Sequence, residues 1–206
     1  MIAVIDYGMG NLRSVEKALQ SLGFDAQITS DPEQVIKADR AVLPGVGAFA
    51  DCRTGLMDSG LKEAAAEFIK TGKPFLGICV GMQLLFEKSL EFGEHEGLGY
   101  FKGTVRKFPE EIIAQGMKIP QIGWNSITKK MNHPLLEGIN TGDYFYFVHS
   151  YCVKAEEAGV EALSCEYGMD FSAMVIRDNM AATQFHPEKS QKLGLHLLKN
   201  FGEWKC

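Results

Sequence analysis

Short apolar runs alternate with amphipathic stretches through the first 80 residues, and this alternation constrains the fold more than any other feature of the sequence. Four runs have the length of buried strands: Ile2–Ile5, Phe24–Ile28, Arg40–Leu43 and Phe75–Ile78. Three intervening segments are predicted to be helical: residues 11–22, 33–37 and 61–71. Strands that alternate with helices at this spacing form βαβ units, which build a parallel sheet.

The signals at the ends of the first predicted helix support its bounds. Asn11 is of a residue type favoured at the N-cap, and Gly23 stands just beyond the last apolar residue, where helices commonly end. Between them, four residues at helical spacing form one apolar face: Leu12, Val15, Leu19 and Leu22.

The pattern changes near residue 100, where short runs are separated by Gly, Asn and Asp turns. We expect these runs to be antiparallel or mixed strands that complete the same sheet: Thr104–Lys107, Ser126–Thr128, Tyr144–Val148, Glu161–Cys165 and Ala173–Ile176. A further strand is predicted over Ala181–Gln184 and a closing helix over residues 190–202. No Pro/Ser-rich linker divides the chain, so we expect one α/β domain over residues 1–206.

Composition and charge exclude several classes of function. The formal net charge is −5 and no basic cluster stands out, which argues against nucleic acid as the ligand. Five cysteines are scattered without a CxxC pair, which is typical of a reducing compartment rather than of a disulfide framework or a zinc site. The opening "MIAVIDYG" lacks the basic segment of a signal peptide, and no apolar run approaches ~18 residues. We therefore expect a cytoplasmic protein that does not contact membranes.

Cys79 stands between Gly77 and Gly81 in the stretch "PFLGICVGMQLLFEK". This spacing matches the nucleophile elbow, a sharp and strained turn between a strand and a helix, with Cys in place of Ser. A predicted strand enters the motif, and the helix-forming run "MQLLFEK" leaves it, so that helical N–H groups would face the sulfur and favour a thiolate. The alternative is a buried structural cysteine, since free cysteine is among the most buried residue types.

His186 and Glu188 follow the strand predicted over Ala181–Gln184, in the stretch "QFHPEKS". Two residues apart in an extended segment, their side chains project to the same side, where a carboxylate orients the imidazole of a catalytic base. His133-Pro134 has no carboxylate at the same offset and is interpreted as an ordinary turn. The alternative for His186 is a solvated turn residue.

Gly45 and Gly47 follow the third predicted strand in the stretch "LPGVGAF". Glycines at a strand end allow a backbone N–H to face a ligand, as an oxyanion donor must in acyl transfer. The second donor of an elbow is the N–H of the residue after the nucleophile, here Val80. By contrast, "GMGNLR" has Arg13 where a dinucleotide fingerprint needs its third glycine, so no nucleotide cofactor is expected.

Gln83 and His149 are further polar candidates. Gln83 lies one helical turn after Cys79 in an otherwise apolar run, and its amide needs partners, either backbone groups or the polar end of a substrate. His149, in "FVHSY", competes with His186 as a base but has no acidic neighbour in the sequence.

The motifs "PGVGAF", "GICVGMQLLF" and "HPEKS", in this order and spacing, resemble those of the class I (triad) glutamine amidotransferases. Cys79, His186 and Glu188 match the family's catalytic residues one by one. The resemblance covers about residues 2–202 and implies a single three-layer α/β domain with a central mixed, mostly parallel, flavodoxin-like sheet. Three more stretches are similar to one branch of the family, in which the glutaminase supplies a cyclase: "DYGMGNLRSVEKAL", "PQIGWNSI" and "YFYFVHSY".

The resemblance also implies substrate, partner and further site residues. It implies hydrolysis of L-glutamine without a metal or cofactor, and transfer of the ammonia to a cyclase partner that is a (β/α)₈ barrel. The amides of Gly47 and Val80 would lie near the oxyanion, and four residues would contact glutamine: Gly45, Gln83, Ser150 and Tyr151. Four residues are candidates for the partner interface: Asn11, Trp124, Tyr146 and Lys189. Asn11 is otherwise a helix cap, and Trp124 and Tyr146 are otherwise core aromatics.

Two other functions remain open at this point. One is a glutaminase that serves a different amidotransferase, although "GNLRSVEKAL" and "GVGAF" argue against it. The other is a redox sensor that uses a reactive Cys79 and has no need of His-Pro-Glu. Peroxide separates them, since a sensor gains function when Cys79 is oxidised and a glutaminase loses it.

Overall fold

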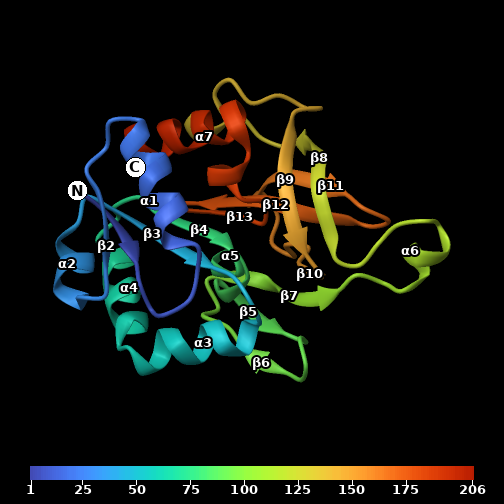
Figure 1. Cartoon of the computed structure of the whole chain (residues 1–206), viewed down its shortest axis with the longest axis horizontal. Helices are drawn as coiled ribbons and strands as arrows, with labels where there is room; N and C mark the ends of the chain where they lie inside the picture. Colours follow the sequence, from blue (N-terminus) through green and yellow to red (C-terminus); the bar gives the residue numbers. More distant parts are fainter.

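The computed structural model describes residues 1–206 and contains a large and a small sheet (Figure 1). The large sheet has nine strands: β1 (Ile2–Ile5), β2 (Ala26–Thr29), β3 (Arg40–Gly45), β4 (Phe75–Cys79), β8 (Gln121–Lys129), β9 (Tyr144–His149), β11 (Glu161–Glu166), β12 (Asp170–Arg177) and β13 (Met180–Thr183). Their order is β2-β1-β3-β4-β13-β12-β11-β8-β9. The four pairings from β2 to β13 are parallel and the four from β13 to β9 are antiparallel, so the sheet is mixed as expected, but half parallel rather than mostly parallel.

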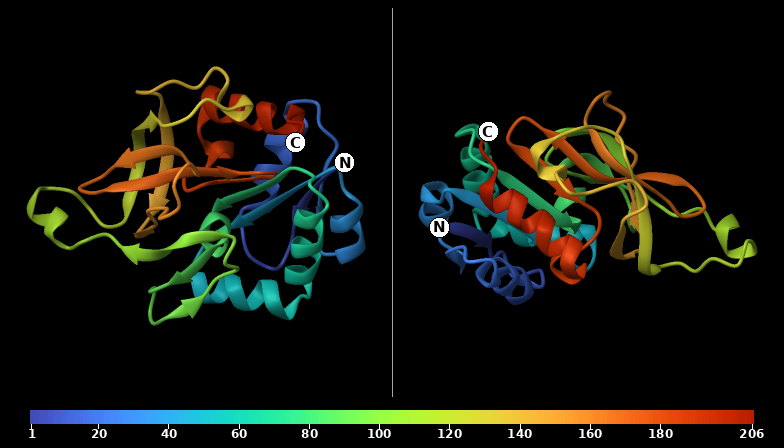
Figure 2. Two further views of the ribbon diagram at one scale, coloured as in Figure 1. Left: turned by 180° about the vertical axis from the view of Figure 1, so that it is seen from behind. Right: turned by 90° about the horizontal axis from the view of Figure 1, so that it is seen from above.

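Helices cover both faces of the parallel half (Figures 1 and 2). They are α1 (Leu12–Ser21), α2 (Pro32–Lys37), α3 (Phe49–Asp58), α4 (Leu61–Lys70), α5 (Val80–Leu84), α6 (Glu111–Ala114) and α7 (Gln191–Glu203), with 3-10 turns η1 (Pro134–Leu136) and η2 (Pro187–Lys189). In Figure 2, α1 and α7 lie on one side of the sheet, and α3 and α4 lie on the other. The result is the three-layer arrangement expected from the sequence. None of these helices combines the length and apolar character needed to cross a membrane.

The small sheet was not predicted. It contains β5 (Phe86–Ser89), β6 (His95–Glu96), β7 (Phe101–Lys107) and β10 (Tyr151–Cys152), in the order β10-β7-β5-β6. The run Thr104–Lys107, expected in the large sheet, therefore belongs to this second sheet. A single cluster of 60 buried residues includes side chains of both sheets, so they share one core.

The helix predicted through Lys88 ends at Leu84, and β5 begins two residues later. The reason is a competing partner for the backbone. The carbonyl of Leu84 accepts a hydrogen bond from the N–H of Leu98 (2.7 Å), and the carbonyl of Leu85 accepts from the N–H groups of Tyr100 and Phe101. Carbonyls that are satisfied by a distant segment no longer need a helical N–H four residues ahead.

The predicted cap of the first helix is only partly right. Gly23 follows α1 at φ +87°, in the left-handed region typical of a residue just beyond a helix. Asn11 occupies the N-cap position, but its side chain bonds no backbone N–H of the first turn. Its Oδ1 instead accepts a hydrogen bond from the hydroxyl of Ser14 (2.9 Å), so Asn11 is not the helix cap that its residue type suggests.

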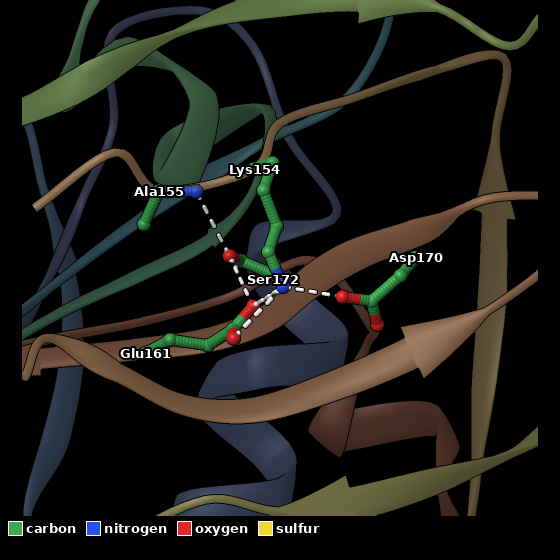
Figure 3. Close-up of polar contacts among 5 residues, drawn as sticks. All are labelled: Lys154, Ala155, Glu161, Asp170 and Ser172. Carbon is green, nitrogen blue, oxygen red and sulfur yellow. Dashed lines mark hydrogen bonds and ion pairs between the residues drawn. The ribbon is translucent and has the colours of Figure 1, made fainter. Parts of the chain in front are cut away.

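A polar cluster anchors the segment after β10 to the β11–β12 hairpin (Figure 3). The Nζ of Lys154 donates to both carboxylate oxygens of Glu161, at 2.8 and 2.9 Å, and also pairs with Asp170. The Ser172 hydroxyl donates to Glu161 (2.7 Å) and accepts from the N–H of Ala155 (3.0 Å). The small sheet is thereby fixed to the large one directly beside β10.

Candidate active site

Cys79 is the last residue of β4, and α5 begins at the next residue. Its backbone has φ 56° and ψ −112°, a conformation that residues other than glycine rarely adopt. A Cβ on Gly81 would lie 1.9 Å from the carbonyl oxygen of Leu43, and a Cβ on Gly77 would lie 2.9 Å from the carbonyl oxygen of Gly81. The strained strand-to-helix turn predicted from the glycine spacing is thus confirmed. Because α5 has only five residues, its dipole at Cys79 is smaller than that of the longer helix expected.

His186 and Glu188 face each other in the turn after β13. The Nδ1 of His186 lies 2.8 Å from Oε1 of Glu188, and the two side chains are only 2% and 1% exposed. The hydroxyl of Ser190 donates to the carbonyl of His186 (2.6 Å) and accepts from the N–H of Tyr146 (3.0 Å), which fixes the turn against β9. The imidazole Nε2 of His186 has no hydrogen-bond partner and remains available to a reacting group.

The electrostatic surroundings favour the protonated form of His186. Burial by itself lowers the pKa of His186. Favourable interactions with the nearby sulfur of Cys79, and then with the carboxylate of Glu188, outweigh burial and hold the pKa of His186 well above its usual value. The imidazole therefore interacts with a sulfur on one side and a carboxylate on the other, which is the arrangement of a nucleophile, a base and an orienting acid.

A cavity of about 510 Å³ opens above Cys79 and His186. It brings together segments far apart in the sequence: Asn11, Val46, Gly47, Cys79, Val80, Gln83, Glu91, Pro120, Val148, His149, Ser150, Tyr151, His186 and Lys189. Ten of the residues singled out from the sequence line it: Asn11, Gly47, Cys79, Val80, Gln83, His149, Ser150, Tyr151, His186 and Lys189.

Four of the residues singled out do not line this cavity. Glu188 lies behind the imidazole of His186, as an orienting group would. Gly45 packs beneath the cavity floor, where an added Cβ would lie 2.7 Å from the N–H nitrogen of Gly81. Trp124 and Tyr146 lie on the outer face of the β8–β9 pair, with ring centroids 6.1 Å apart.

Gln83 is satisfied by protein groups rather than left free for a ligand. Its Nε2 donates to the carbonyl of Tyr151 (3.0 Å) and to Oε1 of Gln184 (3.1 Å). Gln184 is fully buried, and its Nε2 lies 3.8 Å from the sulfur of Cys79. Sequence analysis missed Gln184 beside the nucleophile. A polar residue at the end of an apolar strand was the signal that could have found it.

His149 forms part of the cavity wall and is 6% exposed. Its Nδ1 lies 2.9 Å from the carbonyl of Tyr151, so Nδ1 carries the proton and donates it. Burial lowers the pKa of His149, the bond to Tyr151 opposes this effect, and the nearby charge of His186 adds to it, so that the pKa falls to about 4. His149 is therefore neutral at pH 7, and its Nε2, which has no partner, presents a lone pair.

An exposed apolar face adjoins the cavity on β8 and β9. Ile122, Trp124 and Tyr144 are 63%, 44% and 55% exposed, which is unusual for large apolar side chains on neighbouring strands. Trp124 is therefore not the core aromatic that its residue type would suggest. Lys189, which lines the cavity, is also exposed.

The fold and the cysteine–histidine–glutamate arrangement define a class of enzyme. Residues 3–203 match the family model of glutamine amidotransferase class-I, and the chain belongs to this family. Two curated relatives resemble it more specifically. One, from Caldanaerobacter subterraneus subsp. tengcongensis, is 55% identical over 207 residues and covers 100% of both chains. The other, from Syntrophotalea carbinolica, is 51% identical over 205 residues and covers 98% of this chain and 100% of the relative. Both are named imidazole glycerol phosphate synthase subunit HisH.

Solved structures support the fold. A crystal structure described as a glutamine amidotransferase has a TM-score of 0.74 at 20% identity and covers 98% of this chain and 100% of its own. The PurLQS structure from Thermotoga maritima has a TM-score of 0.72 at 20% identity, with coverage of 98% and 95%. The three-layer α/β fold expected from the sequence is thereby confirmed.

Proposed function

We propose that this chain is the glutaminase subunit of an imidazole glycerol phosphate synthase and acts in histidine biosynthesis in the cytoplasm. The observation that carries the chemistry is the convergence of Cys79 and His186 on one cavity, with Glu188 bonded behind the imidazole. The relatives of 51% and 55% identity support the particular synthase. The substrate is L-glutamine, and the reaction needs no metal or cofactor.

In the first half of the reaction, the sulfur of Cys79 attacks the side-chain amide carbon of glutamine. A C–S bond forms, and the carbonyl oxygen takes up negative charge. His186 then donates a proton to the amide nitrogen, the C–N bond breaks, and ammonia leaves a thioester on Cys79. Glu188 orients the imidazole and stabilises its charged form, so the raised pKa of His186 suits a group that must hold this proton.

In the second half, the neutral His186 takes a proton from a water molecule that attacks the thioester. The C–S bond breaks, glutamate is released, and the proton returns to the sulfur–imidazole pair. The N–H groups of Gly47 and Val80 are the proposed donors to the oxyanion in both halves. Both residues line the cavity beside Cys79, which supports this assignment.

Four residues are proposed to form the glutamine-binding site: Gly45, Gln83, Ser150 and Tyr151. Ser150 and Tyr151 line the cavity directly. Gln83 contributes by donating a hydrogen bond to the Tyr151 carbonyl, and Nδ1 of His149 donates to the same oxygen. Gly45 contributes only by allowing close packing under the loop.

The partner is proposed to be the cyclase subunit of the same synthase, a (β/α)₈ barrel. Ammonia would react there with the nucleotide PRFAR to give imidazole glycerol phosphate and AICAR. The proposed interface includes Asn11, Trp124, Tyr146 and Lys189. It is supported by the exposed apolar face of β8 and β9, which is continuous with the cavity mouth at Lys189.

Glutamate release from glutamine tests the proposal. The pure protein should be measured alone and with the cyclase and PRFAR, with Cys79→Ala in parallel and Cys165→Ala as a control that changes another buried cysteine. We expect stimulation by partner and nucleotide, and loss of activity only in Cys79→Ala. No glutamate release in any mixture would refute a glutaminase and leave the redox sensor. High activity without a partner would keep the glutaminase but assign it to another synthase.

A further inference from the structure

Two buried side chains that the triad does not use donate hydrogen bonds to the backbone at the end of β3 and in the loop that follows it. The hydroxyl of Tyr7 donates to the carbonyl of Pro44 (2.7 Å), and the thiol of Cys52 donates to the carbonyl of Val46 (3.3 Å). Tyr7 is 5% exposed and Cys52 is fully buried. Both therefore act from the core side of the loop, while Val46 lines the cavity on its other side.

Both donors keep their protons at neutral pH. Burial raises the pKa of Tyr7 far above its usual value, and interactions with Cys52 raise it further. Burial also raises the pKa of the Cys52 thiol to about 11, despite the opposing interaction with Tyr7. Neither group titrates over the range in which enzymes of this kind are assayed, so the two hydrogen bonds persist there.

The bond from Cys52 determines the direction of the next N–H group. In a trans peptide the carbonyl and the N–H point in opposite directions. Because the Val46 carbonyl points to Cys52 in the core, the N–H of Gly47 points away from the core, to the side on which Gly47 lines the cavity. This N–H donates to no other group of the chain, so it is free to bind an oxyanion.

The loop would not hold this orientation through its own backbone. Gly47 has φ +96°, and glycine populates both signs of φ almost equally well. Gly45 is also permissive, and the Tyr7 hydroxyl occupies the space where its Cβ would lie, at 2.9 Å. The hydrogen bonds from Tyr7 and Cys52 therefore select one orientation of the Pro44–Gly45 and Val46–Gly47 peptides.

We propose that Cys52 and Tyr7 are positioning residues that hold the Val46–Gly47 peptide with the Gly47 N–H directed at the oxyanion of the reaction. Cys52 fixes this peptide directly, and Tyr7 fixes the Pro44–Gly45 peptide, two peptides earlier, through the Pro44 carbonyl. The inference rests on the proposed glutaminase function and adds to it the side chains that prepare the oxyanion site. Neither residue touches glutamine.

The test uses the complete synthase, with cyclase and nucleotide bound. Glutamine kcat and KM are measured for the wild type, Cys52→Ala, Cys52→Ser and Tyr7→Phe, with Cys165→Ala as the matched control. Cys165 is another buried free cysteine, and it belongs to β11, away from the loop. Alkylation of Cys79 by iodoacetamide is measured in parallel, because it reports the nucleophile without needing an oxyanion site.

We expect Cys52→Ala and Tyr7→Phe to lower kcat by about 3- to 10-fold, as the loss of one hydrogen bond to a single donor peptide implies. KM and the alkylation rate of Cys79 should stay within about twofold of wild type, since neither depends on this N–H. Cys52→Ser should restore most of kcat, because its hydroxyl also donates to a carbonyl.

Three results would overturn the inference. They are wild-type kcat in Cys52→Ala, equal impairment of Cys52→Ser and Cys52→Ala, or a rise in kcat, which would mean that the thiol holds the loop in an unproductive orientation. Each presupposes an active wild-type complex. An inactive wild-type complex would instead refute the proposed function, so the two failures are distinguishable.

Discussion

His149 should make the protein less stable as the pH falls, and replacing it should remove that sensitivity. The imidazole packs against the rings of Phe108, Phe147 and Phe171, with centroid separations of 5.1, 5.8 and 5.2 Å. These surroundings lower the pKa of His149 from 6.5 to about 4. Asparagine is the informative substitution because its amide nitrogen can take the place of Nδ1 and donate to Tyr151, yet it does not titrate.

The sign follows from proton uptake by the unfolded chain. Below a pH of about 6.5, His149 becomes protonated in the unfolded chain but stays neutral in the folded protein, and this proton uptake favours the unfolded state. The stabilisation from a neutral His149 is complete above that pH and is lost as the pH falls toward 4. The shift implies a loss of about 2 kcal/mol between pH 7 and pH 5. His186 has a raised pKa and the opposite sign, but it is present in both proteins and cancels in their difference.

Urea unfolding of the wild type and His149→Asn at pH 7, 6 and 5 measures this difference. We expect His149→Asn to be less stable than the wild type at pH 7, because the smaller side chain leaves a cavity among aromatic rings. The difference in unfolding free energy between the two proteins should then narrow by about 2 kcal/mol at pH 5. This corresponds to a shift of about 1 M in the difference between urea midpoints. Phe75→Leu, which destabilises the core without removing a titrating group, should give a curve parallel to wild type. Parallel curves for His149→Asn would refute the assignment of a neutral, buried His149.

Three further substitutions test other parts of the structure. Gly81→Ala should lower the unfolding free energy by about 2–3 kcal/mol in urea, because its Cβ would lie 1.9 Å from the Leu43 carbonyl; wild-type stability would contradict this packing. Glu188→Gln should lower kcat for glutamate release by about 100-fold with little change in KM, because His186 loses its charged partner, and an unchanged kcat would argue against an orienting role. Asn179→Ala should cost about 1–3 kcal/mol in thermal unfolding, since its amide donates to two backbone carbonyls at 2.9 and 2.7 Å; a smaller loss would mean that water replaces these bonds.

The parallel half of the fold could be predicted because each of its elements carries a complete local signal. Ile2–Ile5 is a short apolar run bounded by turn residues, and the observed strand has the same bounds. The small sheet could not be predicted in this way. Phe86–Ser89 has an apolar pattern compatible with a helix, and the choice of strand depends on pairing with residues 101–105. Pairing between distant segments does not change the hydrophobic periodicity of either segment, so the sequence pattern does not predict it.

The residues of the candidate site also fall into those with a local sequence signal and those without one. Cys79, His186 and Glu188 stand in short motifs whose spacing predicts their geometry, and the structure places Cys79 and His186 at one cavity with Glu188 bonded behind the imidazole. Tyr7 and Cys52 left no such signal, because each contacts a backbone carbonyl more than five residues away. A side chain that acts on backbone can be found only when the path of that backbone is known.

Strand register explains why residues from such distant positions meet. β3, β4 and β13 are neighbours and parallel, so their carboxyl ends lie at one edge of the sheet. Gly45 pairs with Cys79, which sets the loop after β3 beside the nucleophile, and Thr183 pairs with Ile78. One residue further along each chain, Gln184 must then lie beside Cys79, as its 3.8 Å separation from the sulfur shows. His186 follows two residues later, where the chain turns back over the cysteine. The site is thus a consequence of the register of three strands, and a slip of one residue in β13 would turn Gln184 away from the sulfur and displace the base with it.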